Sequence, residues 1–275
     1  ITSCDVEDGP FINDYDSYIN PDKKVLIEDF TGHTCQNCPD AARELDAISA
    51  IYPDQIIGMA IHVGSFARPG WGTTTDDPYS YDFRTKRGDV VDNSFGNLSY
   101  ALPSGMINRA GYPDNHKLGS GEWLAAVTNE LKKEIAFKIY ISSDESSISI
   151  TSVVQKDING DYNLVVCLTE SNIINWQLDG QIEDSTYEHN HVLRTELINQ
   201  ELSTPTNYVA GQEIENIINY DLVALEQSNI DYSNADLHGN GNAGEWDATN
   251  MSVVAYIYNT ITKEIVQVEE AHLTN

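Results

Sequence analysis

Two cysteines three positions apart carry the clearest chemical potential in this sequence. Cys35 and Cys38 form a Cys-X-X-Cys motif, a pattern that can hold a metal ion or exchange disulfides. The sequence has no second cysteine pair, and the nearest histidines, His33 and His62, lack zinc-finger spacing. We therefore predict no metal site at this motif and favour a redox role.

The elements expected around the motif support this interpretation. Residues 24–30 have the apolar centre of a strand that is buried on both faces. Beyond the motif, apolar residues recur at helical spacing as far as Ile51, and Pro39 lies in the first turn, where its missing N–H costs nothing. Residues 56–61 predict a second buried strand. Such a strand-helix-strand unit implies a parallel pair with a right-handed crossover.

The position of the motif at a helix N-terminus has a chemical consequence. The positive end of the helix dipole and its free amide groups stabilise a thiolate, so the pKa of the thiol falls. Cys35 is then the attacking sulfur, and Cys38, one turn inside the helix, resolves the mixed disulfide. A static disulfide that only pins the start of the helix is the alternative interpretation, and it stays open.

The rest of the first half predicts a domain with an insertion. Periodicity is lost over residues 63–101, apart from a weak helical pattern over residues 81–95. Pro103 then precedes a short strand. A further amphipathic helix, with Ser120 as its N-cap, closes this first domain at residue 134. The domain is therefore expected to cover residues 20–134.

The second half changes to a period of two, which is typical of strands. Asn159-Gly160 predicts a hairpin turn, because both central positions of such a turn favour positive backbone dihedrals. No helix is expected between residues 187 and 269, and residues 231–250, rich in Asn, Asp and Gly, are expected to form a long loop. We predict an all-β, immunoglobulin-like sandwich over residues 135–275.

Other side chains are weaker candidates for a site. His189 and His191 lie on one face of a predicted strand and could share a metal ion, but no third ligand is evident, so ordinary hydrogen-bonded histidines are favoured. The acidic loop over residues 231–247 lacks the spacing of an EF-hand, so a weak structural calcium site is the most that we expect there. Cys167 lies in an apolar run and is interpreted as a buried apolar residue.

Aromatic residues of the insertion form a candidate binding surface over the cysteines. They are Trp71, Tyr79, Tyr81 and Phe83. Trp71 is the one that we take as a substrate-binding residue. Burial of these rings against their own domain explains their presence equally well.

The N-terminus and the charge bear on where the protein acts. Residues 1–4, Ile-Thr-Ser-Cys, resemble a bacterial lipobox, so Cys4 is a candidate for lipidation and residues 1–19 for a tether. A chance cysteine in a disordered terminus is the alternative. The sequence has no run of about 20 apolar residues, which a transmembrane helix would need. With 43 acidic and 15 basic residues, the formal net charge of −28 repels nucleic acid.

Together these features resemble the thioredoxin superfamily over residues 20–134. Asp29, six residues before the first cysteine of the motif, stands where thioredoxins have a buried acid that assists proton transfer. Leu102-Pro103 falls where that family has its cis-proline, so the resemblance implies that Leu102 and Pro103 shape the substrate groove. Thr34 in place of the usual aromatic residue, and the insertion, depart from the family pattern.

Two segments also resemble the 28-kilodalton outer-membrane-protein family of Bacteroidetes lipoproteins. They are residues 26–39, which contain the motif, and residues 187–194, Tyr-Glu-His-Asn-His-Val-Leu-Arg. This resemblance implies a thioredoxin-like first domain, a β-rich second domain and a location in the cell envelope, at the outer membrane, facing the periplasm or the cell surface. It supplies no substrate.

The sequence thus predicts an exported thiol-disulfide oxidoreductase that acts on exported proteins or peptides, is held by a lipid anchor and needs no cofactor beyond its own redox-active disulfide. The alternative is a non-catalytic binding or assembly lipoprotein at the cell surface, in which a thioredoxin-like scaffold carries a structural disulfide. Exposure of the sulfur of Cys35 separates the two hypotheses: a groove argues for exchange and a capped disulfide for a scaffold.

Overall fold

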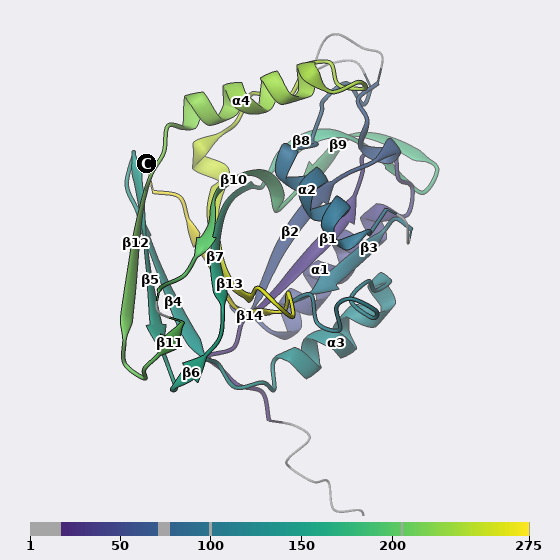
Figure 1. Cartoon of the computed structure of the whole chain (residues 1–275). Coiled ribbons are helices and arrows are strands. Elements are labelled where there is room, and N and C mark those ends of the chain that lie inside the picture. The colour runs from purple at the N-terminus through teal and green to yellow at the C-terminus, as the bar shows by residue number, and fades with distance from the viewer. Residues whose placement is uncertain (1–17, 71–77, 99–100, 205, 275) are drawn as a thin grey trace, which may run out of the picture.

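The structure is a computed structural model of the 275-residue chain, and it describes residues 18–70, 78–98, 101–204 and 206–274. Cys4, the predicted lipidation site, and Trp71, a predicted substrate-binding residue, lie outside the described residues. The described part is mixed α/β, with one large sheet and three small sheets (Figure 1).

The large sheet has seven strands in the order β14-β13-β7-β10-β2-β1-β3. The strands are β1 (Val25–Thr31), β2 (Ile56–His62), β3 (Ser104–Ile107), β7 (Tyr162–Glu170), β10 (Val192–Glu201), β13 (Met251–Asn259) and β14 (Ile265–His272). β1 and β2 are parallel, β3 is antiparallel to β1, and β10 lies beside β2. The sheet therefore takes strands from both halves of the chain.

Helices cover both faces of the sheet at its β1 end. Alternate residues of β1 point to opposite faces. Val25 and Ile27 share an apolar cluster with α1 (Cys38–Ile51) and α3 (Trp123–Glu130), whereas Leu26 and Phe30 share one with α2 (Lys86–Phe95). The predicted strand-helix-strand unit is confirmed, and α1 begins at the motif itself.

Smaller elements complete the first half. The short 3-10 turns are η2 (Ser65–Ala67) and η3 (Ser120–Glu122). The prediction that Ser120 caps the helix is wrong, because Ser120 opens η3 and α3 begins only at Trp123. The Gly119 N–H donates to Oε2 of Glu122 at 2.9 Å, and this bond closes the turn ahead of the helix.

The second half adds three small sheets. Their strands are β4 (Phe137–Ser143), β5 (Ser147–Val154), β6 (Ile158–Asn159), β8 (Ile173–Asp179), β9 (Ile182–His189), β11 (Asn207–Tyr208) and β12 (Glu213–Asn219). The predicted hairpin at Asn159-Gly160 is not formed, because Ile158 and Asn159 pair with β11 instead of with the strand that follows them. β8 and β9 pair only with each other among the described strands.

One helix appears where none was expected. α4 (Leu222–Ala235) begins after Asp221, whose side chain accepts from the Ala224 N–H, and ends inside the segment that was predicted to be a loop. Its apolar residues do not form one buried stripe: Val223 is 76% exposed, and the buried residues are Asn229 and Ser233. The periodicity that normally indicates a helix is therefore missing.

The apolar core joins the two halves of the chain. On β7, Val165 and Cys167 belong to a cluster that also contains Met59 and Ile61 of β2, so this core crosses residue 134. The opposite face of β7 packs in a second cluster with β4 and β5. The division into a thioredoxin-like domain and an immunoglobulin-like sandwich stays a prediction about how these parts fold.

Candidate functional site

The two cysteines of the motif form a disulfide at the N-terminus of α1. Their Cα atoms are 5.4 Å apart, and the turn that carries them is closed by the Cys35 N–H donating to the Gly32 carbonyl at 3.0 Å. Cys35 is only 3% exposed and Cys38 only 2% exposed. The predicted position between strand and helix is confirmed, and the disulfide is covered.

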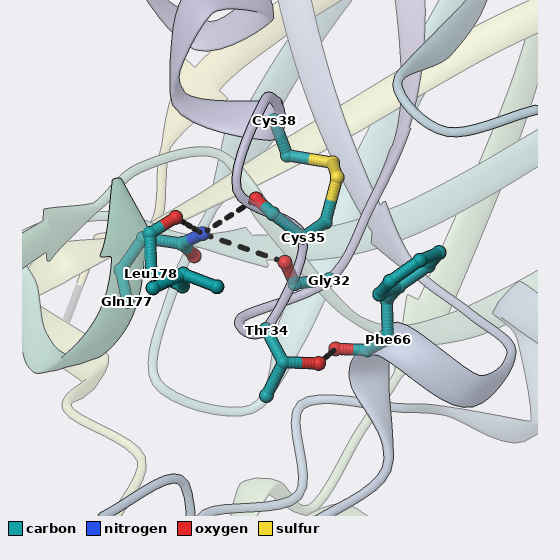
Figure 2. The surroundings of a disulfide bond; sticks show 7 residues. All are labelled: Gly32, Thr34, Cys35, Cys38, Phe66, Gln177 and Leu178. Atoms are coloured by element: carbon teal, nitrogen blue, oxygen red, sulfur yellow. Dashed lines mark hydrogen bonds between the residues drawn. A yellow bond between two sulfur atoms is a disulfide. The ribbon is translucent and has the colours of Figure 1, made fainter. Parts of the chain in front are cut away.

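The cover on one side is the hairpin of β8 and β9. Figure 2 shows Gln177 pointing at the motif loop, where its side-chain amide donates to the carbonyls of Cys35 at 3.3 Å and Gly32 at 3.5 Å. The backbone N–H of Leu178 donates to the His33 carbonyl at 2.8 Å. A shift in the β8–β9 register between Asn175 and Gln177 accompanies this turn of the strand toward the motif.

The tip of the same hairpin is held to the motif and to α1. The Gly180 N–H donates to the Gln36 carbonyl at 2.8 Å. Arg43 of α1 forms two hydrogen bonds to the Asp179 carboxylate, at 2.9 and 3.1 Å. The hairpin therefore follows the motif loop along its length, although about 140 residues separate the two in sequence.

On the other side, η2 packs against the motif loop. A Cβ atom on Gly32 would lie 2.5 Å from the backbone carbon of Phe66, so only glycine fits at this contact. Thr34 donates from its hydroxyl to the Phe66 carbonyl at 2.9 Å (Figure 2). The threonine that replaces the expected aromatic residue thus fixes η2 to the motif.

Asp29 lies on the α1 face of the sheet, beside a pocket that Cys38 also lines. It is 4% exposed, and its Oδ1 atom has no hydrogen-bond partner among the described residues. Burial raises the pKa of this carboxyl to about 7. Asp29 and Cys38 line the same pocket of about 40 Å³, which is large enough to hold water.

Two histidines complete the wall of this pocket. His62 ends β2 and His189 ends β9, and their rings lie 5.8 Å apart between centroids. Both nitrogens of His62 and Nε2 of His189 lack partners among the described residues. Burial lowers the pKa of His189 to about 3 and that of His62 well below its usual value, so both imidazoles are neutral at pH 7.

The predicted pairing of His189 with His191 on one strand face is wrong. β9 ends at His189, and His191 has a φ of 57°, outside either strand. The ring of His189 packs instead against Phe83, with 4.6 Å between centroids. Within the described ranges, no group of three or more His, Cys, Asp or Glu side chains is placed to hold a metal ion.

The predicted proline has the expected backbone geometry. The Leu102-Pro103 bond is cis, and the pairing of Ser104 with Phe30 sets it beside the end of β1 that leads into the motif. A second cis bond, Tyr112-Pro113, was not predicted. The substrate-binding role of Leu102 and Pro103 stays a prediction.

The remaining candidates have structural surroundings. Cys167 is fully buried, and burial raises the pKa of its thiol to about 12, which makes it unreactive. Tyr81 and Phe83 are 3% and 1% exposed, so these two rings are core residues, while Tyr79 is half-buried. In the predicted calcium loop, the Asp236 carboxylate is paired with Arg84 at 2.7 Å.

Sequence reasoning missed the side chains that the hairpin brings to the site. Gln177, Tyr187 and His189 all line the pocket, and no local pattern marks them as neighbours of the cysteines. The one available signal was the family resemblance over residues 187–194, a segment that contains two of them.

Comparisons with known proteins assign the chain to a family. Residues 91–275, more than half of the chain, match the model for outer membrane protein Omp28. The chain therefore belongs to the Omp28 family of outer membrane proteins, which confirms the resemblance noted in its sequence and places it in the envelope, at the outer membrane. The cysteine motif precedes the matched residues.

Two solved structures share the fold at low sequence identity, and a third matches with a low TM-score. HBP35 of Porphyromonas gingivalis is 14% identical with a TM-score of 0.64, over 92% of this chain and 76% of that one. Protein AGR_C_4864 from Agrobacterium tumefaciens is 14% identical with a TM-score of 0.54, over 92% of this chain and 95% of that one. A domain of the outer membrane lipoprotein Omp28 from Porphyromonas gingivalis is 16% identical over 52% of this chain and 91% of that one, with a TM-score of 0.27.

No curated protein matches the sequence. None of the helices in the described ranges has the length and apolar character needed to cross a membrane.

Proposed function

We propose that this outer membrane protein is a thiol-disulfide oxidoreductase of the cell envelope that acts on exported proteins. Cys35 is the sulfur attacked by the client, and Cys38 is the leaving and resolving sulfur. The arrangement of β1, motif, α1 and β2, with a cis-proline before β3, supports a thioredoxin-like site. The helix N-terminus favours a thiolate at Cys35.

One observation carries this proposal: the buried Asp29 carboxyl shares a pocket with Cys38 and has an unpartnered oxygen. Burying an ionisable group without partners destabilises a fold. A static disulfide needs no such group, because it neither gains nor loses protons. A reactive pair does, because Cys38, when it is released as a thiolate in this buried pocket, must take up a proton, and perturbed carboxyls are typical of such sites.

Disulfide transfer to the client takes place in two steps. A client thiolate attacks the sulfur of Cys35, the Cys35–Cys38 bond breaks, and Cys38 leaves as a thiolate that takes the proton of Asp29. A second client thiolate then attacks the client sulfur of the mixed disulfide, and Cys35 leaves as a thiolate. The client gains a disulfide and loses two electrons, which the protein holds as the Cys35 thiolate and the Cys38 thiol, with Asp29 left as a carboxylate; the reverse reaction retraces these steps.

A second function is favoured by a different observation. The disulfide is almost completely buried under the β8–β9 hairpin, which is what a binding or assembly protein with a structural disulfide would have. In that case the disulfide pins the start of α1, and the unpartnered carboxyl has no chemical role.

The reduction potential of the pair separates the two functions. We would equilibrate the protein in glutathione and dithiothreitol buffers and count alkylated cysteines by mass, with Cys35→Ser to assign the signal. A potential between about −120 and −270 mV supports exchange, whereas one below about −300 mV, typical of structural disulfides, overturns the proposal in favour of the scaffold.

A further inference from the structure

The β8–β9 hairpin is joined to the sheet through two short linkers. Residues 171–172 connect it to β7, and residues 190–191 connect it to β10. Each linker contains a non-glycine residue with positive φ, Asn172 at 58° and His191 at 57°, a conformation that few such residues adopt. The linkers are bonded to each other: the Asn172 N–H donates to Oδ1 of Asn190, and the His191 N–H donates to Oγ of Ser171.

Little of the hairpin is buried. Among the residues of β8 and β9, only Gln177 and His189 are buried, while Ile174 and Ile182 are 57% and 69% exposed. His189 lies at the base, next to the linkers, where its ring packs on Phe83. The base is therefore anchored in the core, and the hairpin beyond it lies on the surface except at Gln177, which is buried against the motif loop.

The tip is held over the disulfide by a small set of polar contacts. They are the Gln177 amide on the Cys35 and Gly32 carbonyls, two backbone N–H groups on the motif loop, and the Arg43–Asp179 pair. One ring contact adds to them, between Trp176 of β8 and Tyr79, with 6.0 Å between centroids. An exposed ion pair stabilises only weakly, and the side chains of Arg43 and Asp179 are 54% and 34% exposed. These contacts can break without loss of the apolar core.

We propose that residues 174–188 form a lid that closes over the Cys35–Cys38 disulfide and swings about the base of the hairpin, where the paired linkers meet His189, to admit a client. The proposal rests on the proposed function, because a structural disulfide needs no access. Short terminal segments that absorb changes of φ and ψ are the usual hinges of such motions. The closed lid protects the disulfide from attack by small thiols. Its opening admits water to the pocket that holds Asp29.

The rate at which tris(2-carboxyethyl)phosphine reduces the disulfide tests the lid in the intact chain, read by alkylation and mass. Asp179→Asn removes the ion pair without touching a cysteine, and we expect a roughly two- to fivefold faster reduction. Gln177→Ala removes the bonds to the motif loop, and we expect a roughly fivefold faster reduction.

Asp184→Asn is the matched control. Asp184 carries the same charge on the same hairpin, but among the described residues its hydrogen bonds run only to Thr186. The disulfide of Asp184→Asn should therefore be reduced at the wild-type rate. The lid is overturned if both test variants reduce at the wild-type rate while thermal unfolding shows them folded. It is also overturned if the control accelerates as much as they do.

This test is separate from that of the proposed function. The lid governs a rate, whereas the redox role is judged from an equilibrium potential. If the potential lies below about −300 mV and the variants are reduced faster, the lid is retained as a moving cover and the oxidoreductase function is rejected. If the potential lies in the catalytic range and the variants are reduced at the wild-type rate, the lid is rejected and the oxidoreductase function is retained.

Discussion

At the scale of single residues, two adjacent carboxyls of β1 have opposite surroundings. Glu28 points to the α2 face, where its Oε1 atom pairs with a guanidinium nitrogen of Arg109 at 2.6 Å. Asp29 points to the α1 face and meets a small pocket beside Cys38. Strand alternation separates the two side chains, so one becomes a structural ion and the other a protonated acid at mildly acidic pH.

Replacing Asp29 should change how stability depends on pH. Burial raises the pKa of Asp29 from 3.8 to about 7, so the folded chain retains a proton that the unfolded chain has released. The oxidised wild type should therefore lose stability relative to Asp29→Asn as pH rises from about 4 to 7, by up to about 4 kcal/mol in total. Urea unfolding at several pH values measures this difference.

The difference between the two proteins does not contain the contribution of the buried histidines, because both retain His33, His62 and His189. Those groups have lowered pKa values, so they act with the opposite sign and destabilise the fold as pH falls. Parallel stability curves for the wild type and Asp29→Asn would show that Asp29 does not titrate as a buried acid.

At the scale of elements, a buried ion pair ties β1 to β13. Arg109, just after β3, donates to both carboxylate oxygens of Glu28 and to the hydroxyl of Tyr256 on β13 at 2.9 Å. Both charged side chains are at most 2% exposed, and the guanidinium also lies 4.7 Å from the ring centre of Phe95 on α2. Three elements, β1, β13 and α2, thus meet at the charge of Arg109.

Glu28→Gln should destabilise the protein strongly, because it leaves the guanidinium of Arg109 buried without its counter-ion. Removing one partner of a buried pair costs about 3–5 kcal/mol, and urea unfolding measures it. The exposed pair of Glu134 with Lys156 offers a control, since Glu134→Gln should leave the unfolding free energy nearly unchanged. Equal losses for the two variants would contradict the role given to the buried pair.

At the scale of the whole molecule, the large sheet crosses the predicted domain boundary. β10 from the second half lies beside β2 from the first, where Val192 pairs with Ala60 and the Ala60 N–H donates to the His191 carbonyl at 2.8 Å. The core cluster on the α2 face likewise draws residues from both sides of residue 134. If the two halves were separated, β2 and β10 would each become an unpaired edge strand.

We therefore expect the chain to unfold in one cooperative transition. A fragment of residues 20–134 would expose the edge of β2 and the apolar side chains of Met59 and Ile61, so it should lack a cooperative transition of its own. Calorimetry of the chain and circular dichroism of the fragment test this. Two separate transitions and a folded fragment would instead support the two-domain prediction.

Much of the candidate site could be predicted from the sequence. The buried strand before Cys35, the helix that starts at Cys38, the cis-proline before β3 and the buried acid on β1 all follow from short-range patterns or from family resemblance. These features depend on backbone preferences and on alternation within one element, and both are written in neighbouring residues.

Only the tertiary structure decided what covers the disulfide. Gln177 reaches the carbonyl of Cys35 from 142 positions away, and His189 reaches the pocket from the end of another strand. α4 forms although its apolar residues do not make one stripe, and β10 joins β2 across the expected boundary. Such contacts depend on strand order and register over the whole chain, which local periodicity does not encode.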